Sequence, residues 1–223
     1  NVVSETSASV EARRNAIWAL SRIPEAEAVL AIATGLNDEQ ETVRLTAMRA
    51  LGTRLRSSKQ EETLLSLTTF VVNDTPPVRR DAANVLGWAG EKGPGYSDAA
   101  RETALAALFE SLRKADADRI LEHALIWNVI RINDREKTIP YLSDASPVVR
   151  RAALIALDQM DEGNLTRELV TPLLDTDDPA LQQQALAIMT KHEGWATETL
   201  DLLRSWLAEA DWDDSRSAVV RGF

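Results

Sequence analysis

Apolar residues recur along this chain at intervals of four, a spacing that places side chains on one face of an α-helix. The clearest example is the stretch SPVVRRAALIALDQM, in which Val149, Ala153 and Leu157 are four residues apart. Similar stretches begin near residues 9, 40, 75 and 178. A half-buried strand would instead alternate apolar and polar residues at every second position. The pattern therefore predicts helices, and its recurrence predicts a repeated structural unit.

An alanine marks the middle of each recurring stretch and is used here as an anchor for comparing the copies. An apolar residue lies four positions before each anchor, and in most copies another lies four positions after it. The exception is the copy within 119–130, where Asn128 occupies the later position. A small anchor allows a neighbouring helix to approach closely. The anchors, separated by 31, 35, 42, 29 and 32 residues, are Ala16, Ala47, Ala82, Ala124, Ala153 and Ala185.

Further helical segments lie between these copies, at 25–36, 59–72, 98–115, 135–142 and 165–174, and a last segment at 195–210 would open another pair. The joints between segments, such as NDEQ, NDTPP and DTDDP, are rich in Asp, Thr and Pro, which favour helix starts. The sequence therefore predicts an all-α protein in which helix pairs of about 30 to 40 residues stack into an α-solenoid of six to seven repeats. We expect one domain over residues 1–223, with a Gly-rich insertion near 87–97.

Acidic residues in the joints stand at a fixed distance from arginines in the following helices. The three pairs, each six residues apart, are Asp38 with Arg44, Asp74 with Arg80, and Asp144 with Arg150. This spacing, and the pattern Pro-x-Val-Arg-x-x-Ala, resemble the stacked Asp–Arg ladder of HEAT repeats. The resemblance covers nearly the whole chain and implies that Asp38–Arg44 and Asp144–Arg150 are ion pairs at the repeat joints. It leaves the function open, because HEAT arrays serve many functions.

A narrower resemblance rests on the stretches LEHALI and RRAALIALDQMD. They resemble the HEAT segment of large exported dehydrogenase-like proteins of planctomycetes, in which this segment lies between a β-propeller and a c-type haem domain. The resemblance implies a linking module from a secreted or periplasmic redox protein, present here as a fragment of a longer chain. The haem-attachment motif C-x-x-C-H is absent from this sequence, which has no cysteine. The resemblance therefore assigns redox chemistry to no residue of this chain.

Composition and charge narrow the possible functions. The 25 Lys and Arg residues against 35 Asp and Glu give a net charge of −10, which counts against nucleic acid or an anionic membrane as the main partner. No apolar run is long enough to span a membrane. Neither His123 nor His192 has a second histidine at helical spacing, so we expect structural or surface roles for both. The sequence predicts no catalytic residue, no metal and no other cofactor.

Three functions are compatible with a HEAT array. The first, which we favour, is a non-catalytic scaffold or interaction module that binds a protein partner or the flanking domains of its parent chain. The second is a HEAT-like DNA glycosylase, which would need a basic face, aromatic residues and a carboxylate near a flipped base. The net charge counts against it. The third is a bilin-lyase-like protein, for which the sequence offers no identifiable site.

The HEAT resemblance also implies where a partner binds, because the second helix of each pair lines the concave side of such an array. Residues two before, two after and six after each anchor lie opposite the anchor on that helix. This rule selects six basic residues and one acidic residue, and so predicts a cationic groove for an acidic segment. For the copy anchored at Ala124 it selects Glu122, Ile126 and Ile130. The residues predicted to carry the binding are Arg14, Trp18, Arg22, Arg49, Arg80, Trp88 and Arg151. Alternatively, some of these arginines pair with acidic residues of adjacent repeats.

Overall fold

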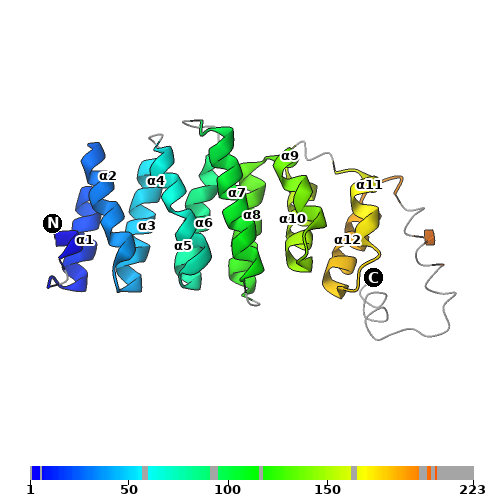
Figure 1. The fold of residues 1–223 in the computed structure, drawn as a ribbon, viewed down its shortest axis with the longest axis horizontal. Coiled ribbons are helices and arrows are strands. Elements are labelled where there is room, and N and C mark those ends of the chain that lie inside the picture. The colour runs from blue at the N-terminus through cyan, green and yellow to red at the C-terminus, as the bar shows by residue number, and fades with distance from the viewer. Residues whose placement is uncertain are drawn as a thin grey trace. The chain divides into compact units, whose positions relative to one another are not determined.

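The computed structural model describes residues 2–5, 7–56, 60–90, 95–115, 118–161, 165–195, 200–201 and 204. Every regular element within these ranges is a helix, which confirms the all-α prediction. The chain divides into two compact units, unit 1 at Asn1–Asp134 and unit 2 at Arg135–Phe223 (Figure 1). One continuous domain over residues 1–223 stays a prediction. No helix in the described ranges is both long and apolar enough to cross a membrane.

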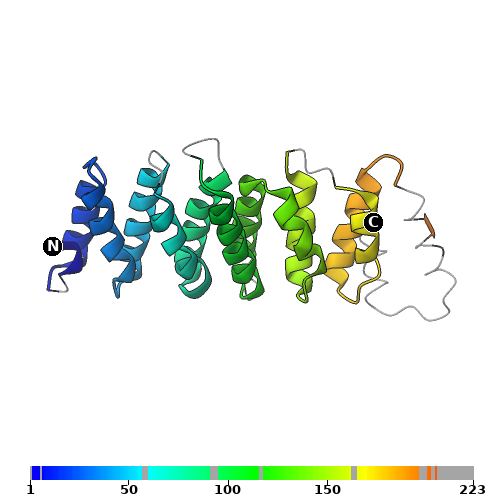
Figure 2. The ribbon, with the colours of Figure 1, turned by 45° about the horizontal axis from the view of Figure 1, so that its top comes forward.

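Unit 1 consists of two layers of helices (Figures 1 and 2). In the second-helix layer each helix contacts the next, in the order α1 (Val10–Leu20), α3 (Glu41–Leu55), α6 (Pro76–Leu86) and α8 (Arg119–Ile132). The first-helix layer contains α2 (Ala26–Ala33), α4 (Glu61–Ser66), α5 (Thr68–Asn73) and α7 (Asp98–Arg113). Helices α2, α5 and α7 pack against α3, α6 and α8. Short 3-10 helices complete the unit: η1 (Val2–Ser4), η2 (Thr34–Asn37) and η3 (Gly87–Gly90).

Unit 2 repeats this pairing with shorter first helices. The second helices α10 (Pro147–Gln159) and α12 (Pro179–Lys191) contact each other. The predicted first helices at 135–142 and 165–174 are each a single α-turn followed by a 3-10 turn. Pro140 and Pro172 lie in these 3-10 turns, and a proline has no N–H group with which to continue an α-helix. The elements are α9 (Arg135–Thr138), η4 (Ile139–Ser143), α11 (Arg167–Val170) and η5 (Thr171–Leu173).

The predicted helix starts are confirmed at the joints, but side-chain capping is not general there, because Gln40, Thr75 and Ser146, which precede α3, α6 and α10, make no capping hydrogen bond. Helices α6, α10 and α12 each begin with a proline, at a position where a missing N–H is tolerated. The side chain of Ser97 caps α7 by accepting a hydrogen bond from the N–H of Ala100. The carboxylates of Asp118 and Asp178 cap α8 and α12 in the same way. Residues 91–94 of the Gly-rich insertion, and most of the segment at 195–210, lie outside the described residues.

The packing core confirms the predicted helix register in four of the six copies. The anchors Ala47, Ala82, Ala153 and Ala185 are fully buried. The apolar residues four positions before and after each of them are also buried. Ala16 of α1 is only half-buried. The side chains buried at every fourth position form the stripe that packs each second helix against the adjacent first-helix layer.

The predicted register is wrong by one residue in α8. Ala124 is only half-buried there, and the buried stripe consists of Leu121, Leu125 and Val129. Ile126, which was predicted to be exposed, retains 8% of its accessible surface. The residues opposite the core on α8 are therefore two before, two after and six after Leu125: His123, Trp127 and Arg131.

A close contact with the preceding repeat accommodates Asn128 of α8, the residue that interrupted the predicted apolar spacing. The space comes from the neighbouring repeat, at Gly87 of η3. A Cβ atom on Gly87 would lie 2.0 Å from Oδ1 of Asn128. Asn128 is fully buried, and its Nδ2 donates hydrogen bonds to Asn84 Oδ1 at 3.0 Å and to the Ala124 carbonyl at 2.7 Å. The close contact requires a residue without a side chain, and that residue is Gly87 of η3 and not a residue of α8.

Candidate functional site

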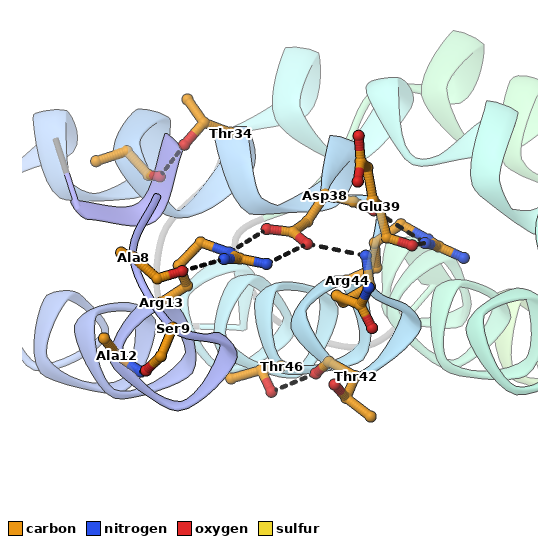
Figure 3. A network of polar contacts seen from close by, with 12 residues as sticks. Ala8, Ser9, Ala12, Arg13, Thr34, Asp38, Glu39, Thr42, Arg44 and Thr46 are labelled. Carbon is orange, nitrogen blue, oxygen red and sulfur yellow. Dashed lines mark hydrogen bonds and ion pairs between the residues drawn. The ribbon is translucent and has the colours of Figure 1, made fainter. Parts of the chain in front are cut away.

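An Asp–Arg ladder crosses the joints of unit 1, but its partners belong to consecutive repeats. Arg13 binds the carboxylate of Asp38 through two nitrogens, with Nε–Oδ2 and Nη2–Oδ1 distances of 2.7 and 3.1 Å (Figure 3). Arg44 binds Asp74 in the same way, at 2.9 and 2.8 Å. The side chains involved are mostly shielded from water. Planar two-point pairing of this kind is the strongest form of Arg–carboxylate contact.

The predicted pairing within a joint is therefore wrong. Arg44 donates to the main-chain oxygen of Asp38 at 2.9 Å, and its carboxylate partner is Asp74. Arg150 likewise donates to the main-chain oxygen of Asp144, at 2.8 Å. The carboxylates of Asp38 and Asp144 accept main-chain N–H groups two residues further along their own joints. A separation of six residues brings Nη1 of Arg44 to the carbonyls of its own joint, while Nε and Nη2 bind the carboxylate in the next repeat.

Two opposing effects act on the pKa of Asp38. Burial raises it, whereas the hydrogen bonds from Arg13 and from the Gln40 N–H lower it. The balance leaves the pKa below its ordinary value. A depressed carboxyl pKa stabilises the folded protein at neutral pH, and this contribution is lost as the pH falls through the folded-state pKa.

The third ladder position is Arg79, not Arg80 as predicted. Arg79 directly follows the buried Val78, as Arg44 follows Val43, because this joint is one residue shorter. Its guanidinium donates to the carbonyls of three residues at the ends of α5 and α7, and to the Ser111 hydroxyl. The accepting carbonyls belong to Val71, Ser111 and Lys114. Arg79 retains 8% exposure and is part of the core.

Opposite the core, the four second helices of unit 1 present a surface that we call the second-helix face. Five of its twelve residues are arginines, three are tryptophans and none is acidic. Trp18 and Trp127, on the two outer helices of the layer, are 44% and 51% exposed. The second-helix face consists of Arg14, Trp18 and Arg22 of α1; Leu45, Arg49 and Thr53 of α3; Arg80 and Asn84 of α6 with Trp88 of η3; and His123, Trp127 and Arg131 of α8.

The arginines of this face differ in their local partners. Arg49 pairs with Asp81 of the next second helix, with an Nε–Oδ2 distance of 2.7 Å, so pairing between adjacent repeats does occur. Its side chain still exposes 57% of its surface. Arg14 donates to the Thr46 hydroxyl at 3.3 Å, which leaves its charge uncompensated by that contact. The side chains of Arg22 and Arg80 make no hydrogen bond or ion pair with any residue in the described ranges.

Trp88 is held in place by neighbours from α3 and α8. It lies close to Gly52 of α3, where a Cβ atom would be 2.8 Å from the indole ring. The guanidinium carbons of Arg56 and Arg131 are 5.0 and 5.9 Å from its ring centroid, within the range of cation–π attraction. Arg131 also donates to the carbonyl of Asn84. The second-helix face therefore holds positive charge beside an aromatic ring in a defined geometry.

In unit 2 the corresponding positions are less cationic. Arg151 is half-buried on α10. Lys191 and His192 both contact the carboxylate of Asp158, each at 2.9 Å. Burial raises the pKa of Asp158, but the hydrogen bonds from His192 and Lys191 outweigh it and hold the pKa below its ordinary value. The ring of Trp195 stacks on His192 with a centroid separation of 4.4 Å.

The structure brings together six of the seven predicted binding residues, since all but Arg151 lie on the second-helix face of unit 1. Sequence reasoning missed His123, Trp127 and Arg131, because it placed α8 one residue out of register. Val129 was the signal that could have revealed this, since it completes the apolar spacing that Asn128 appeared to break. Within the described ranges no three potential metal ligands converge. The absence of a cofactor stays a prediction.

Comparisons with known proteins agree with the fold. A family model described as HEAT repeats matches residues 3–87 and 135–223. The archaeal HEAT-like repeats protein from Thermococcus onnurineus is similar in structure, at 16% identity and a TM-score of 0.51, over 99% of this chain and 92% of that one. The complex of CpcE and CpcF of phycocyanin lyase from Nostoc is similar at 21% identity and a TM-score of 0.49, over 99% and 91%. None of the curated proteins compared with the chain matches it.

Proposed function

Because the chain belongs to the HEAT-repeat family, we propose that it is a non-catalytic interaction module, and that a partner docks on the second-helix face of unit 1. One observation carries this proposal. A chain with a net charge of −10 presents five arginines, three tryptophans and no acidic residue at twelve adjacent surface positions. Arg and Trp are the residue types most enriched among interface residues that dominate binding energy.

The surrounding structure supports a rigid docking surface. The ladder of Arg13, Asp38, Arg44 and Asp74 joins consecutive repeats, and the buried Arg79 ties α6 to the ends of α5 and α7. Side chains held on such a scaffold lose less conformational entropy when a partner binds. The exposed Trp18 and Trp127 would lose most of their contact with water in that complex.

The chemistry of the second-helix face supports the non-catalytic assignment. General acid–base or nucleophilic catalysis needs an activated group held by a second one. His123 is the one histidine among the twelve residues of this face, and it is exposed. A DNA glycosylase would also need a carboxylate, and the nearby Asp81 is bound to Arg49. These features favour binding over catalysis.

We further propose that the partner is a domain of the same large exported redox protein. The support is the resemblance of LEHALI and RRAALIALDQMD to the HEAT segment that links a propeller and a haem domain in such proteins. The LEHALI stretch contributes His123 to the second-helix face, and Trp127 follows it directly. Docking of a neighbouring domain there would fix the orientation of the domains that the module joins.

Site-specific photo-crosslinking in the full-length protein tests the docking proposal. A photoreactive phenylalanine at Trp18 or Trp127 should crosslink to one partner polypeptide or to one flanking domain, identified by mass spectrometry. The control is Leu30 of α2, which is 66% exposed but lies in the first-helix layer. Equal crosslinking from Leu30, or none from either tryptophan position, would show that the second-helix face is not the docking surface.

A further inference from the structure

We infer that Arg49, on the inner helix α3 of the second-helix face, binds a carboxylate of the docked protein partner through its two terminal nitrogens, and that Asp81 positions it for this contact. The inference rests on the proposed docking function and adds the chemical group that the partner presents there. Three observations carry it: the single nitrogen that Arg49 uses to bind Asp81, the exposure of its side chain, and the arginines on the two neighbouring helices.

The contact between Arg49 and Asp81 occupies only one side of the guanidinium. Nε donates to Oδ2 of Asp81 at 2.7 Å, and within the described residues neither Nη1 nor Nη2 of Arg49 has a partner. The ladder residues Arg13 and Arg44 instead bind their aspartates through both Nε and Nη2. Because two parallel N–H groups match the two oxygens of a carboxylate, the outer edge of Arg49 can bind a second carboxylate.

The exposure of Arg49 makes this outer edge accessible to a partner. The side chain of Arg49 is 57% exposed, whereas that of Asp81 is 14% exposed. In the ladder pairs of Arg13 and Arg44 no side chain is more than 15% exposed. A shielded carboxylate that holds Nε of an exposed arginine restricts the side chain without covering its terminal nitrogens. An arginine ordered in this way before binding loses less conformational entropy in the complex, so Asp81 is a positioning residue.

Two arginines on the neighbouring helices supply the charge that attracts a carboxylate, since the charges of Arg49 and Asp81 cancel each other. Arg80 adjoins Asp81 in α6, and its side chain makes no hydrogen bond or ion pair with any described residue. Arg14 of α1 donates to the hydroxyl of Thr46, which lies one helical turn before Arg49 in α3. Three arginines and one aspartate therefore meet here, with two positive charges in excess. An excess of positive charge favours the approach of an anionic group.

Trp18 favours a carboxylate that belongs to a polypeptide over a free anion. It occupies on α1 the position that Arg49 occupies on α3, two residues after the anchor, and the two helices are in contact. Trp18 is 44% exposed, so an apolar surface adjoins the cationic one. A partner that presents an apolar side chain beside an acidic one would cover both surfaces, whereas a free anion would leave the indole in water. We therefore expect an Asp or Glu with an apolar neighbour at this contact.

An NMR titration of the purified full chain, labelled with ¹⁵N in its arginines, tests the inference. The probe is an acetylated and amidated tetraglutamate peptide, and the side-chain signals of Arg49 should shift as it binds. Arg49→Lys keeps the positive charge but loses the planar pair of N–H groups, so it should bind the peptide at least fivefold more weakly than the parent chain. The control is Arg22→Lys, at an exposed arginine of the same face, which should bind within twofold of the parent.

Two variants of Asp81 test its role as a positioning residue. Asp81→Asn and Asp81→Ala both remove the negative charge, but only asparagine keeps an oxygen that can accept from Nε of Arg49. The peptide should therefore bind at least threefold more tightly to Asp81→Asn than to Asp81→Ala. The Nε proton of Arg49 should also exchange with water more slowly in the asparagine variant. Equal affinities and equal exchange in the two variants would mean that Asp81 does not position Arg49.

Three results would overturn the assignment of Arg49 itself: no shift of its signals by the peptide, equal losses in Arg49→Lys and Arg22→Lys, or tighter binding of inorganic phosphate than of the peptide. The last result would identify the site as one for phosphate, which also suits a guanidinium. These failures are distinguishable from failure of the proposed function. Crosslinking at Trp18 and Trp127 would still succeed if the partner docked on this face through other contacts.

Discussion

Replacing Arg79 with methionine should destabilise unit 1 by about 3 to 5 kcal/mol, more than any other change to its arginines. Methionine keeps an apolar stem but removes the guanidinium donors from the carbonyls of Val71, Ser111 and Lys114. The hydrogen bonds to Val71 and Ser111 are buried, so water cannot readily replace the guanidinium there, although the Ser111 hydroxyl still donates to Val71 and the Lys114 N–H to Ser111. The free energy of unfolding from urea denaturation, followed by helical circular dichroism, measures the loss.

The neighbouring arginine provides a matched control for this change. Arg80→Met alters the same residue type, on the same helix, one position further along. Because Arg80 is partly exposed, its replacement should change the free energy of unfolding by about 0.5 kcal/mol or less. Equal effects at the two positions would mean that Arg79 does not hold the ends of α5 and α7.

Ala153→Asp should have a comparable effect in unit 2, about 4 kcal/mol or more. Ala153 is fully buried on α10, which packs against η4 and α12. An aspartate there would bury a carboxylate without a partner, or force the helices apart. Thermal unfolding of the purified protein should show a clearly lower midpoint for the transition of unit 2.

The control for this prediction is Ala187→Asp on α12, at an exposed helical position of the same unit. Aspartate is a poorer helix former than alanine, so a loss below about 1 kcal/mol is expected from propensity alone. If Ala153→Asp melts as the Ala187→Asp variant does, the buried stripe of α10 has been assigned to the wrong residues.

The sequence was sufficient to predict the helix pairs, because the interior requires a buried apolar residue at each turn. Val149, Ala153 and Leu157 show this requirement in one helix, and the equivalent residues repeat it in others. The joints were equally predictable, because proline and the capping carboxylates act on their own backbone. A helix start of this kind depends only on the few residues of its own joint, so the sequence of that joint is enough to predict it.

Contacts between repeats were harder to predict. The Arg13–Asp38 and Arg44–Asp74 pairs join residues 25 and 30 positions apart, and each arginine had a nearer aspartate or main-chain oxygen as an alternative partner. The register of α8 depended on Gly87, a residue of the preceding repeat whose missing side chain admits Asn128. A search for a small anchor within α8 itself could not identify this contact.

The second-helix face was predicted in part for the same reasons. Arg49, Arg80 and Trp88 followed directly from a confirmed register, whereas its three residues on α1 were predicted from Ala16, an anchor that is only half-buried. Trp127 and Arg131 required the corrected register of α8. The cation–π contacts of Trp88 required the space above Gly52, which no spacing rule within η3 indicates.

The most direct test of docking on the second-helix face is the affinity of charge-reversed variants for the partner that crosslinking identifies. Isothermal titration calorimetry should show that Arg49→Glu/Arg80→Glu, with an unchanged circular dichroism spectrum, binds at least 100-fold more weakly than the parent chain. Glu62→Lys, on the first-helix layer, should bind within twofold of the parent. Equal losses in the two variants, or no loss in either, would contradict docking on this face.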